Sequence, residues 1–155
     1  MRLKGLNCIV TGGSSGIGAA TVKRFVDEGA QVLIADIDID TANSFAEEMG
    51  SSVGAIKCDV RIEADVKAVS DHAYKTWGKV DVLVNNAGSE LNQTYDKTTL
   101  EEWDRVLDTD LKGPWLMCKY IVPGMVNAGS GSVINISSLN GLVGFPLSTA
   151  YGSAK

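Results

Sequence analysis

The sequence predicts an α/β fold in which a doubly wound parallel sheet lies between two layers of helices. Short apolar runs alternate with longer amphipathic stretches along the 155 residues. A glycine follows several of the amphipathic stretches, at the place where helices commonly end. Strands that alternate with helices form parallel βαβ units with right-handed crossovers, so helices cover both faces of the sheet.

Each element follows from its local pattern. The predicted strands are 6–10, 31–36, 53–59, 80–85 and 132–137, of which 80–85 has the clearest strand composition. The predicted helices are 16–28, 40–49, 63–77 and a long one over about 99–125. Gly113-Pro114 lies near the middle of the long helix and is expected to kink or split it.

Composition indicates one soluble domain over residues 1–155, with 45% apolar and 21% charged residues. The net charge of −5 argues against nucleic-acid binding, and no apolar run reaches the ~18 residues that a membrane span needs. Cys8, Cys58 and Cys118 are scattered, which favours reduced thiols in a cytoplasmic protein rather than a disulfide framework or a metal site.

A glycine-rich turn, T-G-G-S-S-G-I-G, lies between the first predicted strand and helix. At this place a parallel sheet presents a helix N-terminus to a phosphate, and glycine allows a close backbone approach. The alternative is a glycine-rich connection without a ligand. We expect these residues to bind a dinucleotide: Gly12, Ser14, Ser15, Gly16, Ile17 and Gly18.

Asp36 closes the second predicted strand. A carboxylate there can accept hydrogen bonds from the adenosine ribose hydroxyls, and it repels a 2′-phosphate. Ile37 follows it, and the glycine-rich turn contains no Arg or Lys. The predicted cofactor is therefore NAD rather than NADP.

Two further segments follow predicted strands at the same edge of the sheet. Asp59-Val60 is expected near an adenine ring, and Asn86-Ala87-Gly88 beside the cofactor crevice. A purely structural role explains both segments equally well at this point.

The motifs T-G-G-S-S-G-I-G, D-V, N-N-A-G, N-I-S-S and Y-G-S-A-K occur in an order and spacing that resemble the short-chain dehydrogenase/reductase (SDR) family. The resemblance covers the whole chain but only the N-terminal portion of a family member. It implies a Rossmann-type fold, here truncated after the fifth strand. We therefore expect a fragment, with poor solubility or self-association and little turnover alone.

The resemblance implies hydride transfer between NAD(H) and a secondary alcohol or ketone. Tyr151 would be the general acid/base, Ser138 would hold the substrate oxygen, and Lys155 would bind the nicotinamide ribose. Residues i and i+4 share one helix face, so Tyr151 and Lys155 can act together. An ammonium ~4.5 Å from a phenolate stabilises it by roughly 4 kcal/mol at an effective dielectric of ~20.

Asp110 stands where the family usually has an asparagine that completes the catalytic set. An ionised aspartate only accepts hydrogen bonds, whereas asparagine also donates them. Our hypothesis is that Asp110 weakens or retunes the proton relay. It is counted with Ser138, Tyr151 and Lys155 as a catalytic residue.

Two other functions were weighed. A non-catalytic NAD-binding module or scaffold would share the glycine-rich turn and Asp36 but would not need Ser138 or Tyr151. A sugar-nucleotide epimerase is disfavoured by N-N-A-G and by the short spacing. The resemblance further implies a homo-oligomeric parent protein, while the identity of the alcohol or ketone and the direction of the reaction stay open.

Overall fold

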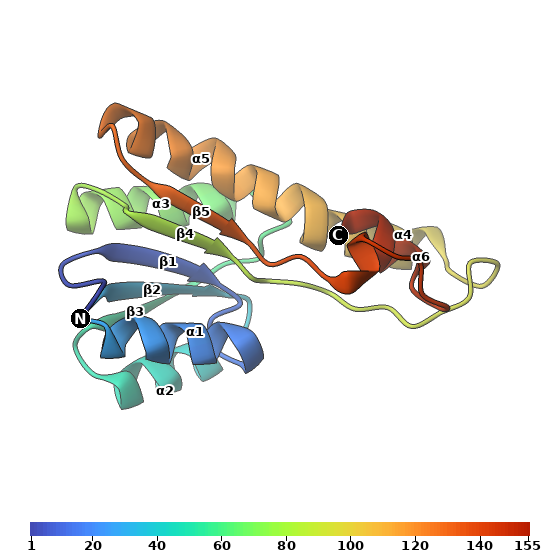
Figure 1. The fold of residues 1–155 in the computed structure, drawn as a ribbon, viewed down its shortest axis with the longest axis horizontal. Helices are drawn as coiled ribbons and strands as arrows, with labels where there is room; N and C mark the ends of the chain where they lie inside the picture. The colour runs from blue at the N-terminus through green and yellow to red at the C-terminus, as the bar shows by residue number, and fades with distance from the viewer.

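Five short parallel strands form the centre of the protein in the computed structural model, which describes residues 1–155 (Figure 1). The strands are β1 (Asn7–Thr11), β2 (Gln31–Asp36), β3 (Val53–Lys57), β4 (Val82–Asn85) and β5 (Ser132–Asn135). Their order in the sheet is β3-β2-β1-β4-β5. The chain therefore winds outward from β1 to one edge and then returns to build the other side. The switch point between β1 and β4 is where such sheets bind ligands, beyond the carboxyl ends of the strands.

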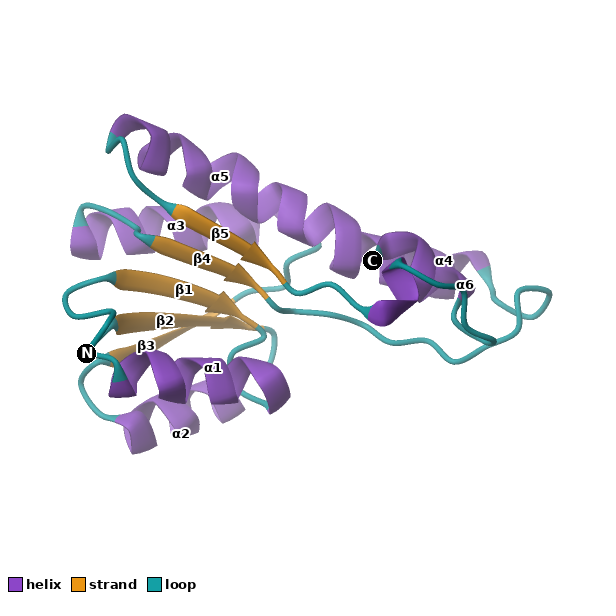
Figure 2. Cartoon of the chain, viewed as in Figure 1, coloured by secondary structure: helices purple, strands orange, loops and turns teal.

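Helices cover both faces of the sheet, as predicted (Figure 2). The helices are α1 (Gly16–Asp27), α2 (Ile39–Met49), α3 (Glu63–Trp77), α4 (Leu100–Leu107), α5 (Gly113–Asn127) and α6 (Thr149–Ala154). Helices α1 and α2 lie on one face, and α3 and α5 on the other (Figure 1). None of them combines the length and apolar character that crossing a bilayer requires.

Alternate residues of the strands supply two apolar cores. Ile9 and Leu33 face α3 and α5, where they join Ile121 in one buried cluster. Val10 faces α1 and packs with Val22 in a second cluster. Because both faces of β1 are buried, the strand reads as a continuous apolar run in the sequence.

The long helix predicted over 99–125 is divided, but upstream of Gly113-Pro114. The segment Asp108–Lys112 is π-helical and joins α4 to α5. Pro114 lies in the first turn of α5, where a missing N–H does no harm. It cannot, however, donate to the carbonyl of Asp110 four residues earlier, so the α-helical pattern is interrupted there. Other boundaries differ from the predictions by one or two residues.

The short helix α6 is held by tertiary packing. Ala150 and Ala154 of α6 form a buried cluster with Val106 of α4, and Trp103 and Tyr151 pack against it. An isolated helix of this length does not persist in water. Contact with α4 therefore supplies the stability that the local sequence lacks.

Candidate active site

The glycine-rich turn brings α1 to the carboxyl end of β1. Gly12 and Gly16 have φ of +60° and +51°, in the left-handed region that favours glycine. A Cβ at Gly18 would collide with the carbonyl of Gly12 and approach Asn86 Nδ2 to 2.7 Å. Ser15, the N-cap residue of α1, makes no side-chain capping bond, so N–H groups at this end stay available for an anion.

Thr11 and Asn86 fasten this turn to the segment after β4. The amides of Asn86 and Ala87 both donate to Thr11 Oγ1 at 3.0 Å. Asn86 Nδ2 in turn donates to the carbonyls of Thr11 and Gly12, each at 3.0 Å. The two loops therefore form one rigid edge at the switch point of the sheet.

Asp36 is buried, and both of its carboxylate oxygens accept hydrogen bonds. Its Oδ2 accepts hydrogen bonds from the amide and hydroxyl of Ser14, at 3.0 and 2.7 Å, and its Oδ1 accepts from the amide of Asp38 at 3.1 Å. The carboxylate thus ties the end of β2 to the glycine-rich turn. This contact was not expected from the sequence, where Asp36 was assigned only to the ribose.

A cavity of about 580 Å³ opens along this edge. Ten of the residues predicted to bind the cofactor line it: Gly12, Ser15, Gly16, Ile17, Asp36, Asp59, Val60, Asn86, Ala87 and Gly88. Ser14 and Gly18 lie behind the wall that these residues form, where Ser14 supports Asp36 and Gly18 packs on Gly12. A cavity of this size, with backbone approach at Gly12 and a carboxylate at Asp36, fits an adenine dinucleotide.

Seven residues of the cavity wall are not among the predicted cofactor-binding residues: Ala35, Ile37, Cys58, Arg61, Ser89, Arg105 and Thr109. Arg61 and Ser89 directly follow the predicted segments Asp59-Val60 and Asn86-Ala87-Gly88, so adjacency in the sequence is a signal for them. Arg105 and Thr109 belong to the helical stretch after Thr99, and only the tertiary fold brings that stretch to the cavity.

Asp59 and Arg61 form a tight pair on the cavity wall. Arg61 Nη2 lies 2.6 Å from Asp59 Oδ2, and Arg61 Nε donates to Asp59 Oδ1 at 2.9 Å. These hydrogen bonds, followed by the charge of the guanidinium, hold the pKa of Asp59 below its usual range. The carboxylate therefore stays ionised beside the place expected for adenine.

Lys155 is paired with Asp110. Its Nζ lies 3.1 Å from Asp110 Oδ1 and donates to the carbonyl of Ile136 at 3.0 Å. The Asp110 side chain is 0% exposed, and its Oδ2 accepts from the amide of Ser89 at 2.8 Å. The ammonium also lies over the Tyr151 ring, 5.5 Å from the centroid. The predicted set of Tyr151, Lys155 and Asp110 is therefore brought together.

This set lies next to the cavity without lining it. Gly88 lines the cavity and also contacts this set, because a Cβ on it would lie 3.0 Å from Asp110 Oδ1 and 3.7 Å from Lys155 Nζ. Ser138 follows β5 and caps the short 3₁₀ turn Leu139–Gly141, where its Oγ accepts from the amide of Asn140 at 3.2 Å. Its neighbour Ser137 donates instead to the carbonyl of Lys155 at 3.3 Å.

Comparison with known proteins now decides the family. The family model described as "short chain dehydrogenase" matches residues 7–155. The chain belongs to the short-chain dehydrogenase family.

Among relatives of this SDR chain, a 3-oxoacyl-(acyl-carrier-protein) reductase of Thermotoga maritima is 35% identical, over 100% of the chain and 64% of the relative. Momilactone A synthase of rice (Oryza sativa) is 40% identical, over 99% of the chain and 57% of the relative. A crystal structure of a metagenomic short-chain oxidoreductase in complex with NADP superposes with a TM-score of 0.95 at 31% identity, covering 100% of this chain and 72% of the other. The chain thus spans about three fifths of the length of these curated relatives.

Proposed function

We propose that this SDR protein is an NAD(H)-dependent oxidoreductase that interconverts a secondary alcohol and a ketone, with residues 1–155 as its dinucleotide-binding domain. The observation that carries the proposal is the position of Lys155. The fold brings its ammonium against Asp110 and the backbone of Ile136, directly behind Gly88 of the cavity wall. A Tyr–Lys pair beside a dinucleotide-sized cavity is the arrangement that this chemistry needs.

The residues divide the work as follows. NAD(H), held by the glycine-rich turn and Lys155, would supply the hydride chemistry at the carbinol carbon. Tyr151 would accept the hydroxyl proton during oxidation and return it during reduction. Loss of this proton together with the hydride converts the alcohol to the ketone. Ser138 would hold the substrate oxygen by a hydrogen bond. Lys155 would bind the ribose and favour the phenolate through its charge.

NAD is preferred over NADP in this proposal because of Asp36. Its carboxylate would accept hydrogen bonds from the ribose hydroxyls and repel a 2′-phosphate. The metagenomic relative was solved in complex with NADP, so the proposed preference for NAD would set this protein apart from it. The preference here depends on the charge at the end of β2.

Calorimetric titration of NAD(H) and NADP(H) tests the cofactor. We expect the wild-type protein to bind NAD(H) more tightly than NADP(H). Asp36→Asn should narrow or reverse this difference in affinity. Asp27→Asn, at the far end of α1, serves as the matched control and should leave both affinities unchanged. Equal binding of the two cofactors by the wild-type protein would contradict the proposal.

A second function, a non-catalytic NAD-binding module or scaffold, is favoured by one observation. The charge that should activate Tyr151 is paired with the buried carboxylate of Asp110. Under this alternative the protein binds NAD(H) but turns over no alcohol or ketone. A panel of secondary alcohols, followed by NADH absorbance with Tyr151→Phe as the inactive reference, distinguishes the two.

A further inference from the structure

Arg105 brings an unpaired guanidinium to the cavity. It lies half-buried on α4, lines the cavity beside Gly88, and donates from Nη1 to the hydroxyl of Ser89. No carboxylate forms a salt bridge with it. Glu102 lies close enough to feel its charge, but that carboxylate accepts hydrogen bonds from the amide and hydroxyl of Thr99 at the helix N-cap.

The other cations at this edge have acidic partners. Arg61 is paired with Asp59, and Lys155 with Asp110. A guanidinium carries five N–H donors in a fixed fork, and a single bond to Ser89 leaves most of them unused. A partly buried charge without a counter-charge destabilises the protein unless an anion joins it. Arg105 is therefore the cavity cation with capacity for an external anion.

The cavity has a second feature that attracts anions. The N-terminus of α1 begins at Gly16, which lines the same cavity, and Ser15 makes no side-chain cap there. The segment that carries Ser89 is fastened to the glycine-rich turn through Asn86 and Thr11. Arg105 and the start of α1 thus line the same cavity, and hydrogen bonds between Asn86 and Thr11 join the segments beside them.

We propose that Arg105 is a further cofactor-binding residue whose guanidinium binds the pyrophosphate of the dinucleotide from the α4 side of the cavity. The inference rests on the proposed function, since it names a new contact within that site. The pyrophosphate carries two negative charges. The dipole of α1 stabilises negative charge near the helix N-terminus, but the glycine-rich turn contains no Arg or Lys to neutralise it. The guanidinium fork matches two phosphate oxygens, which gives orientation as well as affinity.

The test compares the wild-type protein with Arg105→Gln and Arg105→Lys by calorimetric titration. Three ligands are used: NAD, ADP-ribose, which keeps the pyrophosphate but lacks nicotinamide, and inorganic pyrophosphate. Loss of one charge-assisted hydrogen bond predicts an increase in Kd of about tenfold or more in Arg105→Gln for all three ligands. Arg105→Lys keeps the positive charge but lacks the guanidinium fork, so its Kd should lie between those of the wild-type protein and Arg105→Gln. Raising the salt concentration should weaken binding less in Arg105→Gln than in the wild-type protein.

Arg24→Gln is the matched control, since Arg24 lies on the exposed side of α1 and pairs with Glu28. Unchanged NAD affinity in both Arg105 variants would overturn the inference and leave the proposed function intact. A loss confined to NAD, with ADP-ribose unaffected, would also overturn it, because the contact would then be to nicotinamide. Conversely, a wild-type protein that binds pyrophosphate through Arg105 but does not bind NAD would contradict the proposed function and, with it, the assignment of this pyrophosphate to a dinucleotide. If Arg105→Gln does not fold, Arg105→Lys decides between these outcomes.

Discussion

At the scale of single residues, the contact between Asp110 and Lys155 is the one that bears on the proposed role of Tyr151. Its carboxylate is buried, lies 3.1 Å from Lys155 Nζ and is held in place by the amide of Ser89. An ammonium paired with a carboxylate presents little net charge to a third group. Our hypothesis is therefore that Asp110 weakens or retunes the proton relay through Tyr151 and Lys155.

Replacing this carboxylate should shift the pH profile of turnover. In Asp110→Asn, Lys155 loses its carboxylate partner, so we expect the pH profile of kcat/KM and the turnover to change. The measurement is NAD-dependent alcohol oxidation as a function of pH. Asp108→Asn is the control, because Asp108 is half-exposed and pairs with Lys112. An unchanged acid limb and unchanged turnover in Asp110→Asn would refute the hypothesis.

The three cysteines should differ in reactivity. Burial, with a smaller effect of nearby Asp81, raises the pKa of Cys8 to about 12, and burial with nearby carboxylates raises the pKa of Cys58 to about 12. Both thiols therefore stay protonated and sheltered at mildly alkaline pH, where iodoacetamide should modify the half-buried Cys118 first. Peptide mapping by mass spectrometry measures this, and all three should react in denaturant.

The raised pKa values of Cys8 and Cys58 also make the stability of the folded protein depend on pH. The folded state retains protons on Cys8 and Cys58 that an unfolded thiol, with its ordinary pKa of 9.0, would lose. Their contribution to stability is therefore complete below pH 9.0 and is lost as the pH rises toward about 12. Prompt labelling of Cys8 or Cys58 in the folded protein would contradict the burial argument.

At the scale of elements, the glycine-rich turn depends on the absence of a side chain at Gly18. A Cβ there meets the carbonyl of Gly12, which belongs to the backbone and cannot rotate away. The contact couples the start of α1 to β1 and so sets the shape of the cavity wall. Packing and cofactor binding therefore depend on the same residue.

Gly18→Ala should lower both stability and NAD affinity. We expect a loss of about 1–3 kcal/mol in the free energy of unfolding, because the turn must shift to admit the methyl group. Urea unfolding followed by circular dichroism measures this, and calorimetry measures the affinity. Gly54→Ala in β3 is the control, since its Cβ would make only an ordinary contact of 3.7 Å with Leu33. If Gly18→Ala left both the free energy of unfolding and the NAD affinity unchanged, the turn would be more adaptable than its packing indicates.

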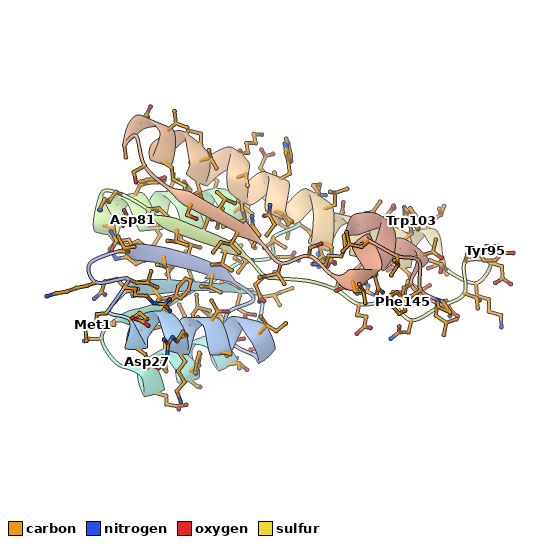
Figure 3. The ribbon with its side chains drawn as sticks, in the orientation of Figure 1. Met1, Asp27, Asp81, Tyr95, Trp103 and Phe145 are labelled. Atoms are coloured by element: carbon orange, nitrogen blue, oxygen red, sulfur yellow. The ribbon has the colours of Figure 1, made fainter.

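At the scale of the whole molecule, the edge strand β5 and the loop after it expose apolar side chains. All four residues of β5 are exposed, whereas β1, β2 and β4 of the same sheet are largely buried. The loop that follows carries further exposed apolar side chains, among them Leu142 and Phe145, the second of which is labelled in Figure 3. An exposed apolar edge strand is a template for pairing with another chain.

The protein should therefore self-associate in a concentration-dependent manner. Ile134→Lys places a charge on β5, and sedimentation velocity should then show a larger monomer fraction than in the wild-type protein. Val126→Lys, at the exposed end of α5, is the control and should change the distribution less. A wild-type protein that stays monomeric at high concentration would contradict this expectation.

Apolar periodicity and glycine positions are local and encode strands, helices and turns directly, so the sequence alone predicts the fold class and the order of the elements. Its motifs carry the resemblance to the family that the family model then shows. The sequence also located most of the cavity wall, because residues that directly follow parallel strands must meet at one edge of the sheet. Tertiary structure decided the rest. The π-helical turn at Asp108–Lys112, the burial of Asp110 against Lys155 and the arrival of Arg105 at the cavity all depend on how the α4–α5 segment crosses the sheet edge. These contacts join residues far apart in the chain, and no local pattern fixes such distances.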